Sequence, residues 1–429
     1  MSRDLSVVRI LLLLLVVSVV PAQGQVMVQG GQVAINQVTA GNQDFAAIDV
    51  SSDGVFAVLW ESADQDGSAD NVYLRRFGAD GVALGDQMRV NVETDDDQHD
   101  PDVAFLSDGR LVVVWDSDQQ DGSQRGVYGR LFDTAGAPVT GEFLVNQVTD
   151  GDQNDPVVAA GLNGGFLVAW ETNPVANPAE NVAARLFDST ATAVADQFLV
   201  NITLTGDQED IDVASDGAGN FVLVWESDDQ DSSPDSIVAR RVDASGALQG
   251  GEIAVNATSA GIHFDPALVV QPDGRFLVVW EELPPTPGPS AVVGRLFAAD
   301  GTAMTSDLRI DDGQGSAELP GAAGGPSGDF LVAWHDDFLD SGELTIVGRH
   351  VTAEGILRGA VERLSPEVAG DQAVARPIVG TDGRGFTVWE TDTGTAINSL
   401  DLFGRRVELP IFFDGFESGD VSAWSAVVP

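Results

Sequence analysis

The sequence contains no cysteine, and all 21 of its basic residues are arginine. Without cysteine the chain has neither disulfides nor thiolate metal sites, so packing alone must hold the fold together. Acidic residues outnumber basic ones by 67 to 21, which gives a net charge of −46. This excess of negative charge makes nucleic acid and anionic membranes poor partners.

Long apolar runs are also scarce, and the one that stands out lies at the N-terminus. The run Ile10–Val20 is followed by Pro21 and Ala22, so that Val20 and Ala22 suit a signal peptidase site. The pattern predicts a secretory signal peptide over residues 1–22, with a retained membrane anchor as the alternative. No other stretch approaches about 18 consecutive apolar residues, so we expect no membrane span in the mature chain. The protein is therefore expected to be secreted or held at the cell surface.

Tryptophan marks an internal repeat that runs through the rest of the chain. Seven tryptophans recur at intervals of 55 residues, with one interval of 54, and each ends a short apolar run such as Phe166–Trp170. They are Trp60, Trp115, Trp170, Trp225, Trp280, Trp334 and Trp389. Such spacing is the signature of a repeat array, and a run that is apolar on both faces predicts a strand buried on both sides.

An arginine recurs 15 residues after each tryptophan, or 16 in the last repeat. These arginines are Arg75, Arg130, Arg185, Arg240, Arg295, Arg349 and Arg405. Each stands in a second expected strand, such as Val127–Phe132, which is followed by a turn and a further strand, such as Glu142–Asn146. A shorter strand, such as Pro156–Ala159, begins each repeat, so every repeat predicts four strands, which we name a to d.

A four-stranded repeat of this length predicts an all-β fold, a seven-bladed β-propeller of antiparallel blades over residues 30–409. An immunoglobulin-like sandwich would need about 100 residues per unit, which excludes that fold. The segment Gln32–Asn36 has the form of a strand d but precedes the first complete repeat, whereas the last repeat stops near Pro410 without a strand d. We expect this N-terminal strand to pair with strand c of blade seven, near Leu402–Val407, and so to close the ring.

The repeat motifs Gly-Asp-Gln-x-Asp-Pro, Phe-Leu-Val-x-Trp-Glu and Val-x-Gly-Arg-Leu-Phe resemble arrays in large secreted, RTX-like bacterial proteins. Some of those proteins also carry calcium-binding nonapeptide repeats, which are absent from this sequence. The C-terminal tail, residues 410–429, contains Asp414-Gly-Phe-Glu-Ser-Gly-Asp420 and resembles a tail found on secreted bacterial proteins. Two interpretations of this tail remain open, a sorting signal and a strand packed on the rim of the propeller.

Acidic loops are expected to gather on one face of the propeller. Strands alternate in direction within a blade, so the d-to-a and b-to-c loops emerge on the same face. Clustered carboxylates repel one another and favour a bound cation, and calcium accepts six to eight oxygen ligands from flexible loops. The candidate calcium ligands are Asp64, Asp66, Asp116, Asp118, Asp121, Asp152, Asp155, Asp228, Asp229 and Asp231. The alternative is a solvated acidic face without a metal.

The recurring arginine is expected to be architectural, because a residue present in all seven repeats cannot mark a single active site. If the b-to-c hairpin turns near Asp66, Arg75 lies on the same face as Trp60, within reach of a cation–π contact. The acidic residue that follows most of the tryptophans, such as Glu61, is expected to pair with an arginine of a neighbouring blade.

No catalytic constellation is evident in the sequence. The four histidines, His99, His263, His335 and His350, lie in different repeats at no metal-ligand spacing. We therefore expect a monomeric propeller that binds a protein or glycan outside the cell, with adhesion as one such role and calcium as a structural ion. A hydrolase or lyase with its site at the mouth of the central channel is one alternative, since a propeller fold alone does not exclude an enzyme. A structural component of the extracellular matrix is the other.

Overall fold

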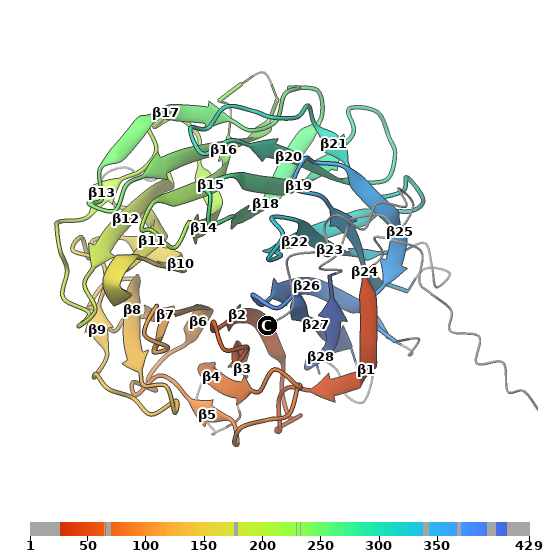
Figure 1. Cartoon of the computed structure of the whole chain (residues 1–429). Coiled ribbons are helices and arrows are strands. Elements are labelled where there is room, and N and C mark those ends of the chain that lie inside the picture. Colours follow the sequence, from red (N-terminus) through yellow and green to blue (C-terminus); the bar gives the residue numbers. More distant parts are fainter. Residues whose placement is uncertain are drawn as a thin grey trace, which may run out of the picture.

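The computed structural model shows a ring of seven four-stranded antiparallel sheets, which confirms the expected seven-bladed propeller (Figure 1). It describes residues 26–63, 65, 70–175, 179–228, 230, 231, 233–337, 343–366, 370–392 and 400–409. The expected signal peptide and C-terminal tail lie outside the described residues. No helix in the described part is long and apolar enough to cross a membrane.

Each blade places strand a at the central channel and strand b next to it (Figure 1). The a strands are β2 (Gln43–Val50), β6 (Gln98–Phe105), β10 (Asp152–Ala160), β14 (Gln208–Ser215), β18 (Ile262–Val270), β22 (Ala317–Gly324) and β26 (Gln372–Val379). The b strands are β3 (Phe56–Ser62), β7 (Leu111–Asp118), β11 (Phe166–Asn173), β15 (Phe221–Asp228), β19 (Phe276–Leu283), β23 (Phe330–Asp336) and β27 (Arg384–Asp392). A short 3-10 helix, η1 (Leu162–Gly164), joins β10 to β11.

Strands c and d form the outer half of each blade. The c strands are β4 (Asn71–Phe77), β8 (Arg125–Phe132), β12 (Asn181–Phe187), β16 (Asp235–Val242), β20 (Ala291–Phe297), β24 (Thr345–Val351) and β28 (Leu400–Glu408). The d strands are β5 (Met88–Arg89), β9 (Phe143–Leu144), β13 (Phe198–Leu199), β17 (Leu248–Ala254), β21 (Leu308–Arg309), β25 (Leu357–Arg363) and β1 (Met27–Ala34). We expected strand a to be the short one, but in four blades it is strand d that keeps only two residues.

The ring closes as expected, because β1 pairs with β28 and completes blade seven. The pairing runs from Met27 opposite Glu408 to Ala34 opposite Phe403, so the strand begins earlier and ends earlier than the expected Gln32–Asn36. The register shifts between Gln29 and Val33, where Gly30 adopts a positive φ of 74°. This irregularity interrupts the alternation of side chains between the two faces of the strand. The sequence pattern therefore did not reveal the first half of the strand.

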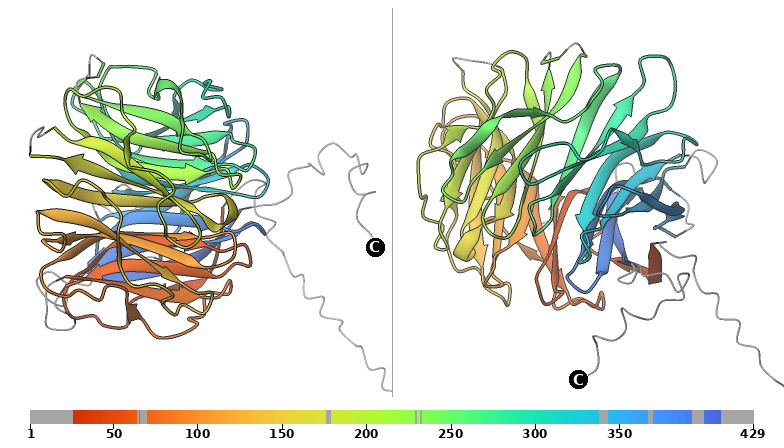
Figure 2. Two further views of the ribbon diagram at one scale, coloured as in Figure 1. Left: turned by 90° about the vertical axis from the view of Figure 1, so that its left-hand side faces the viewer. Right: turned by 45° about the horizontal axis from the view of Figure 1, so that its top comes forward.

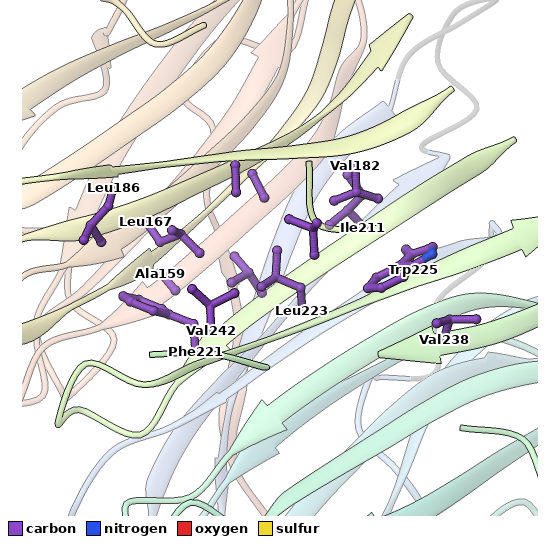
Figure 3. Packing of buried hydrophobic residues seen from close by; sticks show 14 residues of the cluster. Ala159, Leu167, Val182, Leu186, Ile211, Phe221, Leu223, Trp225, Val238 and Val242 are labelled. Atoms are coloured by element: carbon purple, nitrogen blue, oxygen red, sulfur yellow. The ribbon is translucent and has the colours of Figure 1, made fainter. Parts of the chain in front are cut away.

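Strand b carries the core, and all seven tryptophans of the repeat are fully buried. The hydrophobic clusters lie between blades: Figure 3 shows Leu167 and Val182 of blade three against Leu223 and Trp225 of blade four. In the first four blades the tryptophan Nε1 donates to a glutamine at the start of strand a, as Trp225 does to Gln208 at 3.0 Å. The blades thus stand face to face around the ring, as the side view in Figure 2 shows.

The recurring arginines are architectural, but through contacts other than those expected. Each donates from Nη1 to a backbone carbonyl just after strand d of the preceding blade, as Arg185 does to Val145 at 2.8 Å. The register does place Arg75 on the face of Trp60. The ring over which its guanidinium lies is nevertheless Phe77, two residues along the same strand, at 5.3 Å. The expected stacking on tryptophan is therefore wrong, because the guanidinium is drawn outward to the carbonyls of the neighbouring blade.

Candidate functional site

The seven a strands enclose a central cavity of about 700 Å³, and their early residues form its mouth on the side of the d-to-a loops. One position in each strand has a positive φ, between 47° and 56°, although no glycine stands there. These mouth positions are Phe45, Asp100, Asp155, Asp210, Asp265, Leu319 and Val374. The left-handed conformation is costly for non-glycine residues, above all for β-branched ones, so its recurrence indicates a constraint shared by the blades.

All seven positions lie at the register shift near the start of strand a. In four blades the backbone N–H at this position donates to the acidic side chain that follows the tryptophan of the preceding blade. Phe45 donates to Glu390 at 2.9 Å, and Asp210 donates to Glu171 at 2.8 Å. The expectation that this acidic residue pairs with an arginine is wrong in these blades, because its carboxylate turns inward to the exposed amide of the bulged strand.

The mouth is divided chemically into two sectors. Blades two to five supply four aspartates in succession, Asp100, Asp155, Asp210 and Asp265, whereas blades six, seven and one supply Leu319, Val374 and Phe45. The Phe45 side chain is exposed although it is large and apolar. Arg376, two residues beyond Val374, contributes the single basic side chain among the described residues that line the cavity. The mouth positions therefore form a carboxylate sector that faces an apolar sector, although Asp49 and Arg376 line the cavity below the apolar positions.

Burial and mutual repulsion shift the ionisation of the carboxylate sector. The pKa of Asp100 is raised to about 9 by burial, then by the charges of Asp155 and Asp116, and also by a hydrogen bond with Asp155. Burial and the charge of Asp155 also raise the pKa of Asp210. Burial and Asp210 raise the pKa of Asp265 to about 6, although Arg376 acts in the opposite direction. A sector of this kind attracts positive charge or retains protons.

The predicted calcium ligands that the structure describes lie at several different places in the fold. Asp64, Asp66 and Asp229 lie outside the described residues. Asp121 and Asp231 accept hydrogen bonds from Ser123 and Ser233 of their own loops. Asp116 is not a loop residue but is buried in β7, with Asp152 near the same Arg125 side chain. Asp155 lies at the channel mouth, and Asp118 and Asp228 end the b strands of blades two and four.

Three clusters in the described part have acidic or histidine ligand atoms within 4.8 Å of one another. They are Glu61, Asp70 and His99; Asp97, His99 and Asp118; and Glu209, Glu226 and Asp228. A hydrogen bond to Glu61, opposed by burial, raises the pKa of the shared His99 to about 9, so a metal at either of the first two clusters would compete with a proton for this ring. The third cluster contains carboxylates alone.

The predicted calcium ligands did not include most of the aspartates at the channel mouth or most of the cluster of Glu209, Glu226 and Asp228. Asp100, Asp210, Asp265, Glu209 and Glu226 were not among the predicted ligands. The Asp-Pro pair that ends the motif Gly-Asp-Gln-x-Asp-Pro was a usable signal, because it recurs at Asp100 and Asp265 as well as Asp155. The third cluster had no such signal, since only the pairing of β14 with β15 brings Glu209 beside Glu226.

Comparison with known proteins supports the fold and assigns no family. No family model matches the sequence, and no curated protein matches it. A Dyadobacter fermentans protein of unknown function is similar in structure with a TM-score of 0.54 at 10% identity, over 90% of this chain and 99% of that one. A fungal alcohol oxidase of the AA5 family, solved with copper, has a TM-score of 0.51 at 12% identity, over 90% and 77%. At such identity these likenesses establish the propeller fold alone.

Proposed function

We propose that this protein is an exported binding propeller that takes a protein or glycan ligand at the mouth of its central channel. The observation that carries the proposal is the division of the mouth, with the carboxylates of blades two to five on one side and Leu319, Val374 and Phe45 on the other. Binding sites combine apolar walls with a few convergent polar groups, which describes this arrangement. The mouth favours a ligand that presents a positively charged group beside an apolar one.

The mouth can be tested with an array of peptides and amine-bearing glycans, in which each cationic probe has a neutral counterpart. We expect binding to the cationic probes, and Asp155→Asn or Asp265→Asn should weaken it about tenfold, the effect of losing one charge-assisted hydrogen bond. Asp95→Asn removes the same charge from an exposed loop of the same face and should leave the affinity unchanged. Equal losses in all three variants, or equal binding of neutral probes, would show that general negative charge and not the mouth determines binding.

Export is the second part of the proposal and rests on the N-terminal sequence. The secreted or surface-bound protein should begin at Gln23, after removal of residues 1–22. Mass spectrometry of the protein purified from its native host would establish the first residue, and a chain that starts at Met1 would overturn the proposal of a cleaved signal peptide. Analytical ultracentrifugation of the same material should show a monomer.

A glycoside hydrolase is the second candidate, because Asp100 and Asp155 form a hydrogen-bonded carboxyl pair at the mouth. Two carboxyl groups that share a proton can act as general acid and general base in hydrolysis. Glycosidases hold theirs about 5 to 9.5 Å apart, so a bound glycoside would have to separate this pair. Turnover of chromogenic glycosides that is abolished by Asp155→Asn would favour this function over binding.

Copper chemistry has weaker support, since no histidine lines the described cavity and the chain has no cysteine, whereas copper sites use imidazole and thiolate ligands.

A further inference from the structure

Blade four contains a pair of like charges that face each other across two strands. Glu209 of β14 lies directly opposite Glu226 of β15. At this position five other blades place a neutral residue or a histidine on one of the two strands, as with His99 opposite Asp116. Blade one also pairs two acids, Asp44 and Glu61, but there His99 lies 3.4 Å from Glu61. Directly opposed like charges are destabilising, so the pair in blade four requires compensation.

Glu226 also departs from the role of its equivalents. In four other blades the corresponding glutamate accepts a hydrogen bond from the backbone N–H at the mouth of the next blade. The structure gives Glu226 no such bond from Asp265 in the described part of the chain. Its side chain is only 7% exposed and forms a hydrogen bond with Asp210, yet Oε2 has no hydrogen-bond partner among the described residues. A buried carboxylate oxygen left in this state costs free energy unless a ligand satisfies it. Burial, and then the charge of Asp210, raise the pKa of Glu226 to about 9, so calcium would bind there in exchange for a proton.

A third carboxylate completes the arrangement. Asp228, at the end of β15, places an oxygen within 4.8 Å of oxygens of both Glu209 and Glu226. Further acids surround the three: after burial, the charges of Asp210, Glu180, Asp228 and Asp207 all raise the pKa of Glu209, to about 7. The carboxyl groups of Glu209, Glu226 and Asp228 thus form a partly buried acidic cluster where β14 pairs with β15.

We propose that blade four binds one Ca²⁺ ion between the carboxylates of Glu209, Glu226 and Asp228. The carboxylate oxygens lie within 4.8 Å of one another, so one ion at about 2.4 Å from each can be placed among them. Three carboxylates supply up to six oxygens, and Oε2 of Glu226 gains the partner that it lacks. Calcium tolerates such irregular geometry, whereas magnesium requires a near-ideal octahedron and retains its waters. The site adjoins the proposed ligand position at the mouth, because Asp210 follows Glu209 directly and forms a hydrogen bond with Glu226.

Isothermal titration of the metal-free mature protein with CaCl₂ tests the site. Glu226→Gln and Asp228→Asn should each bind one calcium ion fewer per chain, or bind it at least tenfold more weakly. Glu390→Gln is the matched control: it makes the same change at the equivalent position of blade seven, where Ala373 stands opposite, and should bind calcium like the wild type. Asp265→Asn, at the mouth, removes a charge near Glu226 but no proposed calcium ligand, so the number of calcium ions bound per chain should be unchanged.

Circular dichroism in EDTA establishes that each variant is folded, and Asp228→Asn decides the question if the more buried Glu226→Gln does not fold. Calcium should raise the melting temperature of the wild type more than magnesium does at the same ionic strength. The proposal is overturned if the wild type binds no calcium at 10 mM, about ten times the weakest affinity of extracellular calcium modules. It is equally overturned if both variants retain the stoichiometry and affinity of the wild type, or if the two ions raise the melting temperature by the same amount.

Discussion

At the residue scale, the repeat assigns one task to each of its recurring side chains. The tryptophan fills the space between blades, the arginine binds a carbonyl of the blade before it, and in four blades the glutamate after the tryptophan binds the bulge of the blade after it. Trp170, Arg185 and Glu171 show all three tasks within blade three. The recurring arginine and glutamate thus connect neighbouring blades, whereas the strands within a blade are held by their backbone ladders.

Trp170→Ala should lower the free energy of unfolding by about 3 to 5 kcal/mol, because it removes a fully buried aromatic side chain and leaves Gln153 without its partner. Urea denaturation followed by circular dichroism measures the loss. Val175→Ala, at a side chain of the same blade that is 66% exposed, should change the free energy by less than about 0.5 kcal/mol. A loss below about 1 kcal/mol for Trp170→Ala would contradict a core role for the tryptophans.

Arg185→Gln should cost about 1.5 to 3 kcal/mol, the contribution of a charge-assisted hydrogen bond, here to the Val145 carbonyl. The matched control is Arg384→Gln, because the Arg384 side chain is 68% exposed and its ion pair is to Asp382 in the same turn. This control should have almost no effect on the denaturation midpoint. Equal effects of the two substitutions would show that Arg185 does not brace the neighbouring blade.

At the element scale, the least regular strands are the ones that carry the distinctive features of the molecule. Every a strand has a register shift near its start, and this bulge directs one residue per blade to the channel mouth. Bulges are often found beside functional sites because they redirect side chains. The β1 strand is also irregular, yet it alone covers the outer edge of β28.

Deletion of residues 27–34 should leave the edge of β28 unpaired and convert the monomer into aggregates, because an open edge strand pairs with other chains. Size-exclusion chromatography with light scattering measures the change. A synthetic peptide of residues 26–36, added during refolding, should restore the monomer, whereas a scrambled peptide should not. A deletion variant that remains monomeric with an unchanged melting temperature would show that the ring does not depend on this closure.

At the scale of the whole molecule, the −46 charge and the buried carboxyl groups determine how stability depends on pH. The pKa values of Asp100, Asp102 and Glu171 are raised to about 9, 7 and 10, in each case mainly by burial. The folded chain therefore holds protons that the unfolded chain releases at lower pH. Stability from these groups is fully present below about pH 4 and is lost as the pH rises through 7 to 10.

The free energy of unfolding should consequently fall between pH 5 and pH 9, by a few kcal/mol, since one unit of pKa shift corresponds to about 1.4 kcal/mol. Urea denaturation at constant ionic strength, in EDTA, measures this slope. Asp100→Asn should reduce the slope, and Asp95→Asn, in the exposed loop, should not. Stability that rises with pH over this range would contradict the assignment of raised pKa values to the folded state.

The sequence by itself determined the architecture, because the spacing of the recurring tryptophans and arginines gives the length of each blade directly. A buried tryptophan ends each strand b and an arginine lies in each strand c, so the spacing of Trp60, Trp115 and their successors sets the number of blades. The missing strand d of blade seven likewise predicted the closure. Strand ends were less predictable, since the bulge at Gly30 and the two-residue d strands break the alternation on which strand prediction depends.

Only the tertiary structure decided which side chains meet. Asp100 and Asp265 stand 165 positions apart in the sequence, yet the ring brings both to one channel, opposite Phe45. Glu209 and Glu226 meet because of the register of β14 with β15. A slip of one residue would have turned their side chains to opposite faces of the sheet. Sequence analysis did not find the candidate sites because the interaction of two charges depends on their separation in space. Sequence spacing does not give that separation until the pairing of the strands is known.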